Sequence, residues 1–191
     1  SSFSGLYAPL QRPKDNIETI WSGDVFVNGY QNLKGPLTIR PGTTIRLSPE
    51  ATVVLNGRLT AIGTPELPIR FIPFVDDQDP WGSIVLKGDG ADGSVLTNCE
   101  VVGGSGLKSN LFEYSAMLSI HDVDNVSIKN CTFRDNKIVD DMVHGVYSQI
   151  YFDKVIFKNA FADALDLDIC NAEIRNSRFD GSGNDGVDLM T

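Results

Sequence analysis

The feature that most constrains this chain is a repeat of about 22 residues in its second half. Three segments align without gaps: residues 126–133 (VSIKNCTF), 150–157 (IYFDKVIF) and 172–179 (AEIRNSRF). Successive segments begin 24 and 22 residues apart, and a more diverged copy, residues 94–101, precedes them. Self-similarity at a fixed period of this size is typical of solenoids, in which each repeat packs against its neighbours.

Each repeat contains three short stretches in which apolar and polar residues alternate. Two of them meet at a polar corner position, which is occupied in turn by Asn98, Asn130, Lys154 and Asn176. The third stretch of each period covers residues 117–120, 141–146, 163–168 and 185–190. Alternation with a period of two indicates β-strands, and no stretch has the period of an amphipathic helix. Three strands per period predict one coil of a parallel β-helix, with equivalent residues stacked about 4.8 Å apart.

The first half of the chain shows the same kind of pattern. Residues 37–47 and 51–61 alternate, are rich in β-branched side chains and are punctuated by Gly and Pro. We therefore expect an all-β protein with an N-terminal cap or entry segment over residues 1–36 and a parallel β-helix over residues 37–191. The last alternating strand has no capping segment after it. The helix is thus expected to be truncated or continued by another chain or domain, with an end-to-end contact at the C-terminal coil.

Charge and composition exclude several classes of partner. The formal net charge is −9 and the sequence pI is about 4.6, so the surface repels nucleic acid and anionic membranes. The sequence contains no run of about 20 apolar residues, so we expect no membrane insertion. Two of the three cysteines, Cys99 and Cys131, occupy equivalent positions of adjacent repeats, and we expect them to form a buried apolar stack.

Several segments of the chain resemble a known family. They are residues 41–47 (PGTTIRL), 56–64 (NGRLTAIGT), 68–71 (PIRF) and 81–84 (WGSI), together with the repeats that have Asn at the corner. Over roughly residues 35–191, they look like secreted right-handed β-helix proteins of the pectate-lyase-like superfamily. The resemblance implies a right-handed helix and a secreted or cell-surface location, although no signal peptide is visible. It also implies a polysaccharide or glycan surface as partner.

The resemblance further implies where a polysaccharide-binding groove lies. That sheet comprises residues 83–87, 116–121, 141–146, 163–168 and 185–190. The repeat spacing aligns its polar residues into three columns. The first is Asp141, Asp163 and Asp185; the second is His144, Asp166 and Asp188; the third is Lys87, His121, Val146, Asp168 and Met190. Because Leu165 and Leu167 supply the inward alternation, Asp166 and Asp168 are expected to point outward.

Stacked carboxylates need neutralisation. At about 4.8 Å, two like charges repel by about 1 kcal/mol or more, so a cation or bound protons must offset the repulsion. The candidate metal ligands are Asp141, Asp163, Asp185, Asp166 and Asp188. Oxygen-rich sites suit Ca²⁺, which we expect as the cofactor, and the adjacent His144 leaves a transition metal open.

The candidate catalytic residues are Asp166, Asp188 and His144, and the candidate substrate-binding residues are Trp81, Lys87, His121 and Asp168. Paired carboxyl groups one or two coils apart approximate the separations that glycoside hydrolases use. An epimerase with an Asp/His pair fits equally well. A lyase fits less well, because the acidic sheet contains no arginine and Lys87 lies three coils from Asp168.

Structural interpretations remain open for the same residues. Aspartates favour turns because they hydrogen-bond to nearby backbone, which accounts for Asp163 and Asp185 but not for mid-strand Asp166 and Asp188. Trp81 is more often a core or cap residue than a sugar platform, and Lys87 and His121 are more often ordinary surface residues. The sequence therefore predicts a carbohydrate-active or carbohydrate-binding module. The alternative is a non-catalytic structural or adhesin domain of a larger secreted or surface protein.

Overall fold

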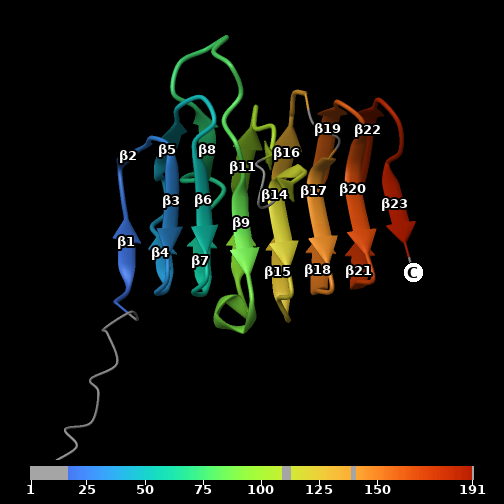
Figure 1. The fold of residues 1–191 in the computed structure, drawn as a ribbon, viewed down its shortest axis with the longest axis horizontal. Helices are drawn as coiled ribbons and strands as arrows, with labels where there is room; N and C mark the ends of the chain where they lie inside the picture. Colours follow the sequence, from blue (N-terminus) through green and yellow to red (C-terminus); the bar gives the residue numbers. More distant parts are fainter. Residues whose placement is uncertain (1–16, 109–112, 139–140, 191) are drawn as a thin grey trace, which may run out of the picture.

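The computed structural model describes residues 17–108, 113–138 and 141–190 (Figure 1). Apart from one 3₁₀ turn, Asp89–Ala91, the regular elements of these residues are β-strands. Twenty-one of the strands form three seven-stranded sheets. In each sheet the neighbouring strands are parallel and come from successive coils.

Every coil contributes one strand to each sheet. Sheet A comprises β1 (Thr19–Trp21), β4 (Leu37–Ile39), β7 (Leu59–Ile62), β10 (Val95–Thr97), β15 (Val126–Lys129), β18 (Gln149–Asp153) and β21 (Asn171–Arg175). Sheet B comprises β2 (Asp24–Val27), β5 (Thr44–Leu47), β8 (Ile69–Pro73), β11 (Cys99–Val102), β16 (Thr132–Arg134), β19 (Ile156–Ala160) and β22 (Arg178–Ser182). Sheet C comprises β3 (Tyr30–Leu33), β6 (Thr52–Leu55), β9 (Ile84–Lys87), β14 (Ala116–His121), β17 (Asp141–Val146), β20 (Asp163–Asp168) and β23 (Val187–Met190).

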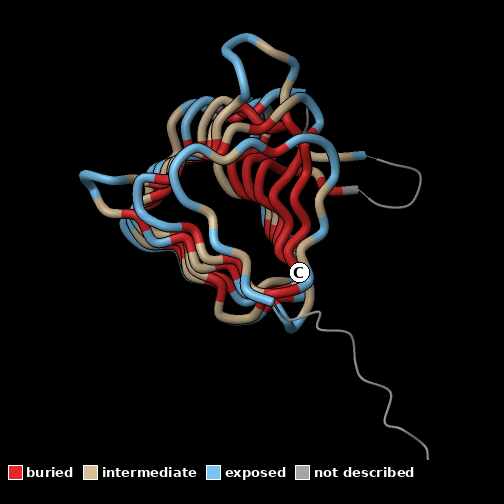
Figure 2. The backbone as a smooth tube through the Cα atoms, turned by 90° about the vertical axis from the view of Figure 1, so that its left-hand side faces the viewer, coloured by how far each residue is buried: buried red, intermediate tan, exposed pale blue. Residues whose placement is uncertain are grey.

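The chain is therefore a right-handed parallel β-helix with three strands per coil, as the repeat predicted. Seen along its axis, the coils superpose into a three-sided tube (Figure 2). The predicted register is also confirmed, because Val126 pairs with Ile150 and Phe133 pairs with Phe157. One excursion interrupts the pattern between β11 and β14, where β12 (Leu107–Lys108) and β13 (Glu113–Tyr114) form a small antiparallel pair.

The ladder of coils begins earlier than residue 37. Strands β1, β2 and β3 pair in parallel with β4, β5 and β6, so residues 19–33 form a complete first coil within the segment expected as a cap. Most side chains of these strands are exposed or half-buried, so their apolar alternation is weaker than in residues 37–61 and did not identify them.

The polar corners between sheets A and B have a backbone explanation. Asn98, Asn130, Lys154 and Asn176 all have positive φ, between 49° and 55°. Asparagine tolerates this left-handed conformation better than most residues, because its short side chain can hydrogen-bond locally. The amides also link the coils: Asn98 Nδ2 donates to Gly63 O at 2.9 Å and Asn176 Nδ2 donates to Asp153 Oδ1 at 2.9 Å.

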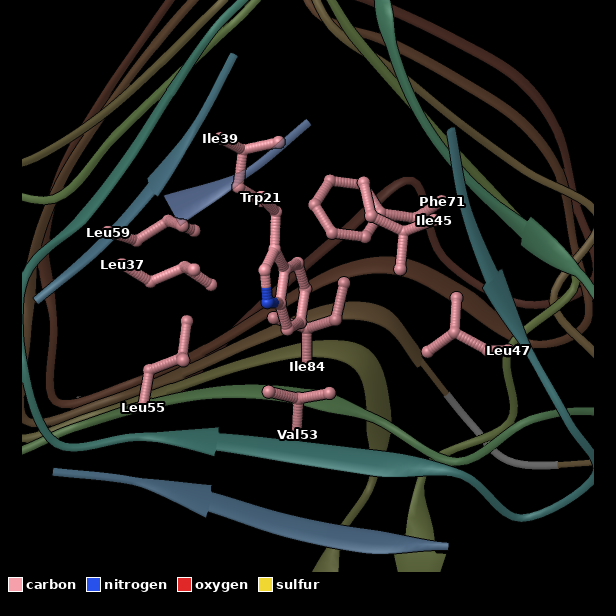
Figure 3. Close-up of a pocket in the computed structure, with 10 residues that line it drawn as sticks. All are labelled: Trp21, Leu37, Ile39, Ile45, Leu47, Val53, Leu55, Leu59, Phe71 and Ile84. Carbon is pink, nitrogen blue, oxygen red and sulfur yellow. The ribbon is translucent and has the colours of Figure 1, made fainter. Parts of the chain in front are cut away.

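The tube is filled by stacked apolar side chains. The rings of Phe133, Phe157 and Phe179 lie nearly parallel, with centroids 5.6 and 4.9 Å apart. Cys99 and Cys131 are buried with free thiols. Near the first coils, ten apolar side chains that include Trp21 and Ile84 surround a small interior space (Figure 3). Its lining residues are all hydrophobic, so this space belongs to the core and offers no polar group to a ligand.

Candidate functional site

Sheet C carries the predicted columns in the predicted register, but Asp141 and Asp163 of the first column are buried, with 2% and 9% of their surface exposed. Asp141 pairs with Asp163, and His144 pairs with Asp166, which pairs with Asp188. The third column runs through Lys87, His121, Val146, Asp168 and Met190. The 22-residue spacing thus gave the correct neighbours along the axis of the helix.

A departure from strict alternation brings the first two columns together. Met142 and Val143 on β17 are consecutive, yet both are buried in the hydrophobic core. Because two successive side chains enter the core, Asp141 and His144 on either side of them face the same way. One ligand atom each from Asp141, His144 and Asp166 lies within 4.8 Å of the other two. Simple alternation would have placed residues three apart on opposite faces.

His144 lies at the centre of a chain of polar contacts. Its Nδ1 is 2.8 Å from Ser115 Oγ, and Ser115 Oγ donates to Asp141 Oδ2 at 2.9 Å. On the other side of the ring, Nε2 lies 3.3 Å from Asp168 Oδ2 and 3.6 Å from Asp166 Oδ2. The side chains of His144, Asp166 and Asp168 are 15%, 23% and 29% exposed, so the group is accessible but partly desolvated.

The surroundings shift the titration of two neighbours. Burial raises the pKa of Asp166; His144 opposes this effect, and the nearby carboxylates of Asp168, Asp188 and Asp163 add to it. Burial, followed by electrostatic interactions with His144 and Lys87, lowers the pKa of His121 to about 4. Perturbed groups of this kind cluster at functional sites.

The second histidine lies beside the first. The His121 ring meets the His144 ring edge to face, with centroids 5.7 Å apart, and meets the Tyr114 ring at 5.5 Å. Within the described residues, His121 Nε2 and Asp168 Oδ1 are buried atoms with no hydrogen-bond partner. Buried polar atoms without partners are uncommon and mark positions where a ligand can supply the missing contact.

The remaining predicted residues have other environments. Asp163 Oδ1 accepts hydrogen bonds from the Asp185 backbone N–H at 2.7 Å and from Asn184 Nδ2 at 2.9 Å, so this carboxylate holds the turn of the next coil. Asp185 and Asp188 are exposed, and Lys87 is exposed in the same column as His121.

Trp81 is a correction to the predicted substrate-binding set. Its side chain is fully buried, and its Nε1 donates to Val102 O at 2.7 Å. The indole belongs to the hydrophobic core and presents no surface to a ligand. The residue type is compatible with both roles, because an apolar ring with a single N–H suits either a core or a sugar platform.

Sequence reasoning missed Ser115 and Tyr114. Both lie where the excursion returns to sheet C, immediately before β14. This segment does not follow the repeat, so no column assigns its residues to the site. The sequence indicated only that this segment lies directly before a strand of the acidic sheet.

No protein family, curated protein or solved structure matches the chain in comparisons of its sequence and fold. Within the described residues, no helix is long and apolar enough to cross a membrane. The function must therefore be argued from the site itself.

Proposed function

We propose that this chain is a carbohydrate-active β-helix module, related to the pectate-lyase-like superfamily and secreted or displayed at a cell surface. It acts on a polysaccharide that lies along the outer face of sheet C. One observation carries the proposal: His144 is held between Ser115 and Asp168 beside Asp166, in a partly buried group on an exposed face.

The shape of this face suits a polymer. Equivalent side chains repeat along the helix axis at about 4.8 Å, so an extended chain meets similar groups in successive coils. Carboxylates and imidazoles hydrogen-bond well to sugar hydroxyls. Asp168, whose side chain is 29% exposed, offers an acceptor of this kind next to His144.

Acid–base chemistry is the reaction type that these groups support. Asp168 can exchange a proton with a sugar unit through Oδ2, the oxygen that also lies 3.3 Å from His144 Nε2. Asp166 and Asp188, adjacent in one column, lie about one strand spacing apart, close to the separation of about 5–5.5 Å in retaining glycosidases. Lys87 is three strand spacings, about 14 Å, from Asp168. This favours hydrolysis or epimerisation over a lyase reaction with Lys87 as base.

A second candidate, a non-catalytic structural or adhesin module, has its own support. Asp163 is engaged in hydrogen bonds to the following turn, so part of the acidic ladder stabilises the fold rather than facing a ligand. This role does not extend to Asp166 and Asp168, whose contacts are with His144.

A panel of neutral, acidic and amino-sugar polysaccharides separates the two candidates. We expect one of them to bind the wild-type protein and to show new reducing ends or altered sugar stereochemistry by NMR. Asp168→Asn should reduce the rate at least 100-fold with little loss of binding, because the side chain keeps its shape. Asp24→Asn, on the exposed face of sheet B beside Arg46, is the matched control and should leave the rate unchanged. Binding without turnover, unaffected by Asp168→Asn, would instead establish the structural or adhesin role.

A further inference from the structure

Three side chains with metal-binding atoms converge from two neighbouring coils. Asp141 and His144 come from β17 and Asp166 from β20, and one ligand atom of each lies within 4.8 Å of the others. A tetrahedral metal ion bonded at about 2.0–2.2 Å holds its donors about 3.3–3.6 Å apart. Small side-chain rotations are therefore enough for the three groups to share one ion.

Ser115 orients the imidazole for this purpose. Its Oγ lies 2.8 Å from His144 Nδ1 and donates to Asp141 Oδ2 at 2.9 Å, so an Nδ1–H that donates to this hydroxyl leaves the lone pair on Nε2. Nε2 is the ring nitrogen beside the second carboxylate ligand, 3.6 Å from Asp166 Oδ2. Histidines that bind metals usually donate their other ring N–H to a hydrogen-bond acceptor, which fixes both tautomer and ring orientation.

In this tautomer, Nε2 faces carboxylates without a proton to share. Asp168 Oδ2 lies 3.3 Å from Nε2 and Asp166 Oδ2 lies 3.6 Å from it. The Nε2 lone pair and the carboxylate oxygens are all acceptors, so these contacts need a proton or a cation between them. A metal ion bonded to Nε2 and to Asp166 meets this need.

The local negative charge also favours a bound cation. Asp163, Asp168 and Asp188 all act electrostatically on Asp166. Within the described residues, His144 is the only basic side chain paired with Asp166 or Asp168. Two carboxylate ligands and a divalent ion are together neutral, which offsets the repulsion between the stacked aspartates.

We propose that Asp141, His144 and Asp166 bind one divalent first-row transition metal ion, with Zn²⁺ bound more tightly than Mn²⁺. An imidazole nitrogen with two carboxylates suits these ions, whereas Ca²⁺ prefers six to eight oxygen ligands. Ca²⁺, the cofactor suggested by the sequence, is therefore expected to bind more weakly. The bound ion would be the cofactor of the proposed carbohydrate-active site. Metal binding itself does not require that function, and only the catalytic use of the ion rests on it. There, the ion would polarise water or a sugar hydroxyl beside Asp168.

The test is a competition titration of the EDTA-treated full chain with Zn²⁺ against a chromophoric chelator, repeated with Mn²⁺ and Ca²⁺. We expect one equivalent of Zn²⁺ to bind and to raise the melting temperature. His144→Gln and Asp166→Asn should each weaken binding at least 100-fold. The matched control is Asp24→Asn, an exposed carboxylate on sheet B that pairs with Arg46, and it should stay within 10-fold of wild type.

Two further variants exclude simpler explanations. Cys170→Ser removes the partly exposed thiol and should leave Zn²⁺ binding unchanged. Asp141→Asn provides a second ligand variant if His144→Gln fails to fold, as judged by circular dichroism.

The proposal is overturned if Zn²⁺ does not bind, if binding survives loss of the ligands, or if Ca²⁺ binds more tightly than Zn²⁺. Because no glycan is present, a failed titration leaves the proposed function standing. Conversely, a protein that binds Zn²⁺ but no polysaccharide retains the metal site alone.

Discussion

The two halves of the outer face of sheet C are built on the same ladder but have opposite chemistry. On β6 and β9, Val54 and Val85 are buried beneath Tyr114, with Leu107 packed against them from the excursion. On β17 and β20, the equivalent column continues as His144 and Asp166, which remain partly exposed. The backbone does not distinguish these halves. A covering segment makes one half a small second core, whereas no described segment covers the other half, which leaves its described side chains available for ligands.

The excursion also joins the two halves. It covers the apolar half with Tyr114 and then places the next residue, Ser115, against His144 and Asp141. A single irregular segment therefore both closes the core side and completes the polar site. This arrangement explains why the site begins where the cover ends.

The largest expected effect comes from the main core, at the residue Trp81 that precedes β9 of the covered half. Trp81→Ala removes a fully buried indole and its hydrogen bond to Val102, and should lower the free energy of unfolding by about 3–5 kcal/mol. Urea unfolding followed by circular dichroism measures this loss. Lys87→Ala, on the exposed face of the neighbouring strand, should change stability by less than about 0.5 kcal/mol. Similar results for the two variants would contradict the assignment of Trp81 to the core.

Within the open half, the two acidic columns should respond differently. Asp163→Ala leaves the Asp185 N–H and the Asn184 amide without their acceptor, and should cost about 1–3 kcal/mol. Asp166→Ala should cost less stability but abolish activity, because its neighbours are His144 and other carboxylates rather than backbone donors. Paired urea and activity measurements separate a structural column from a functional one. Equal stability losses would remove that distinction.

The periodicity of the sequence predicts some contacts of this site and not others. Stacking depends on residue spacing alone, so the alignment of His144, Asp166 and Asp188 followed directly from the 22-residue period. The approach of Asp141 to His144 did not follow, because it requires two consecutive side chains to enter the core. Ser115 was also out of reach, since the excursion has its own length and no repeat fixes where it returns.

The boundary between the halves is expected to be sensitive to pH. His121 has a pKa of about 4 in the folded protein and about 6.5 when unfolded, so between these values the unfolded chain binds more protons. Stability should therefore fall as the pH is lowered from about 6.5 to 4, because protonation favours unfolding. Urea midpoints measured over this range in EDTA should show a shallower slope for His121→Gln than for wild type. Parallel slopes would mean that His121 is solvated rather than enclosed by Tyr114 and His144.

The smallest effect should come from the outermost carboxylate of the second column. Asp188 pairs in register with Asp166 and is exposed, so in metal-free protein the two groups repel each other through solvent. Asp188→Asn should raise the urea midpoint slightly at low ionic strength. The gain should vanish in 1 M salt, where charges interact over only about 3 Å. Asp24→Asn should instead lower the urea midpoint at low ionic strength, because Asp24 pairs with Arg46 and its loss removes an attraction. A stabilising Asp188→Asn therefore identifies the open half as carrying unneutralised negative charge. A destabilising one would show that this column, like Asp163, is held by contacts within the fold.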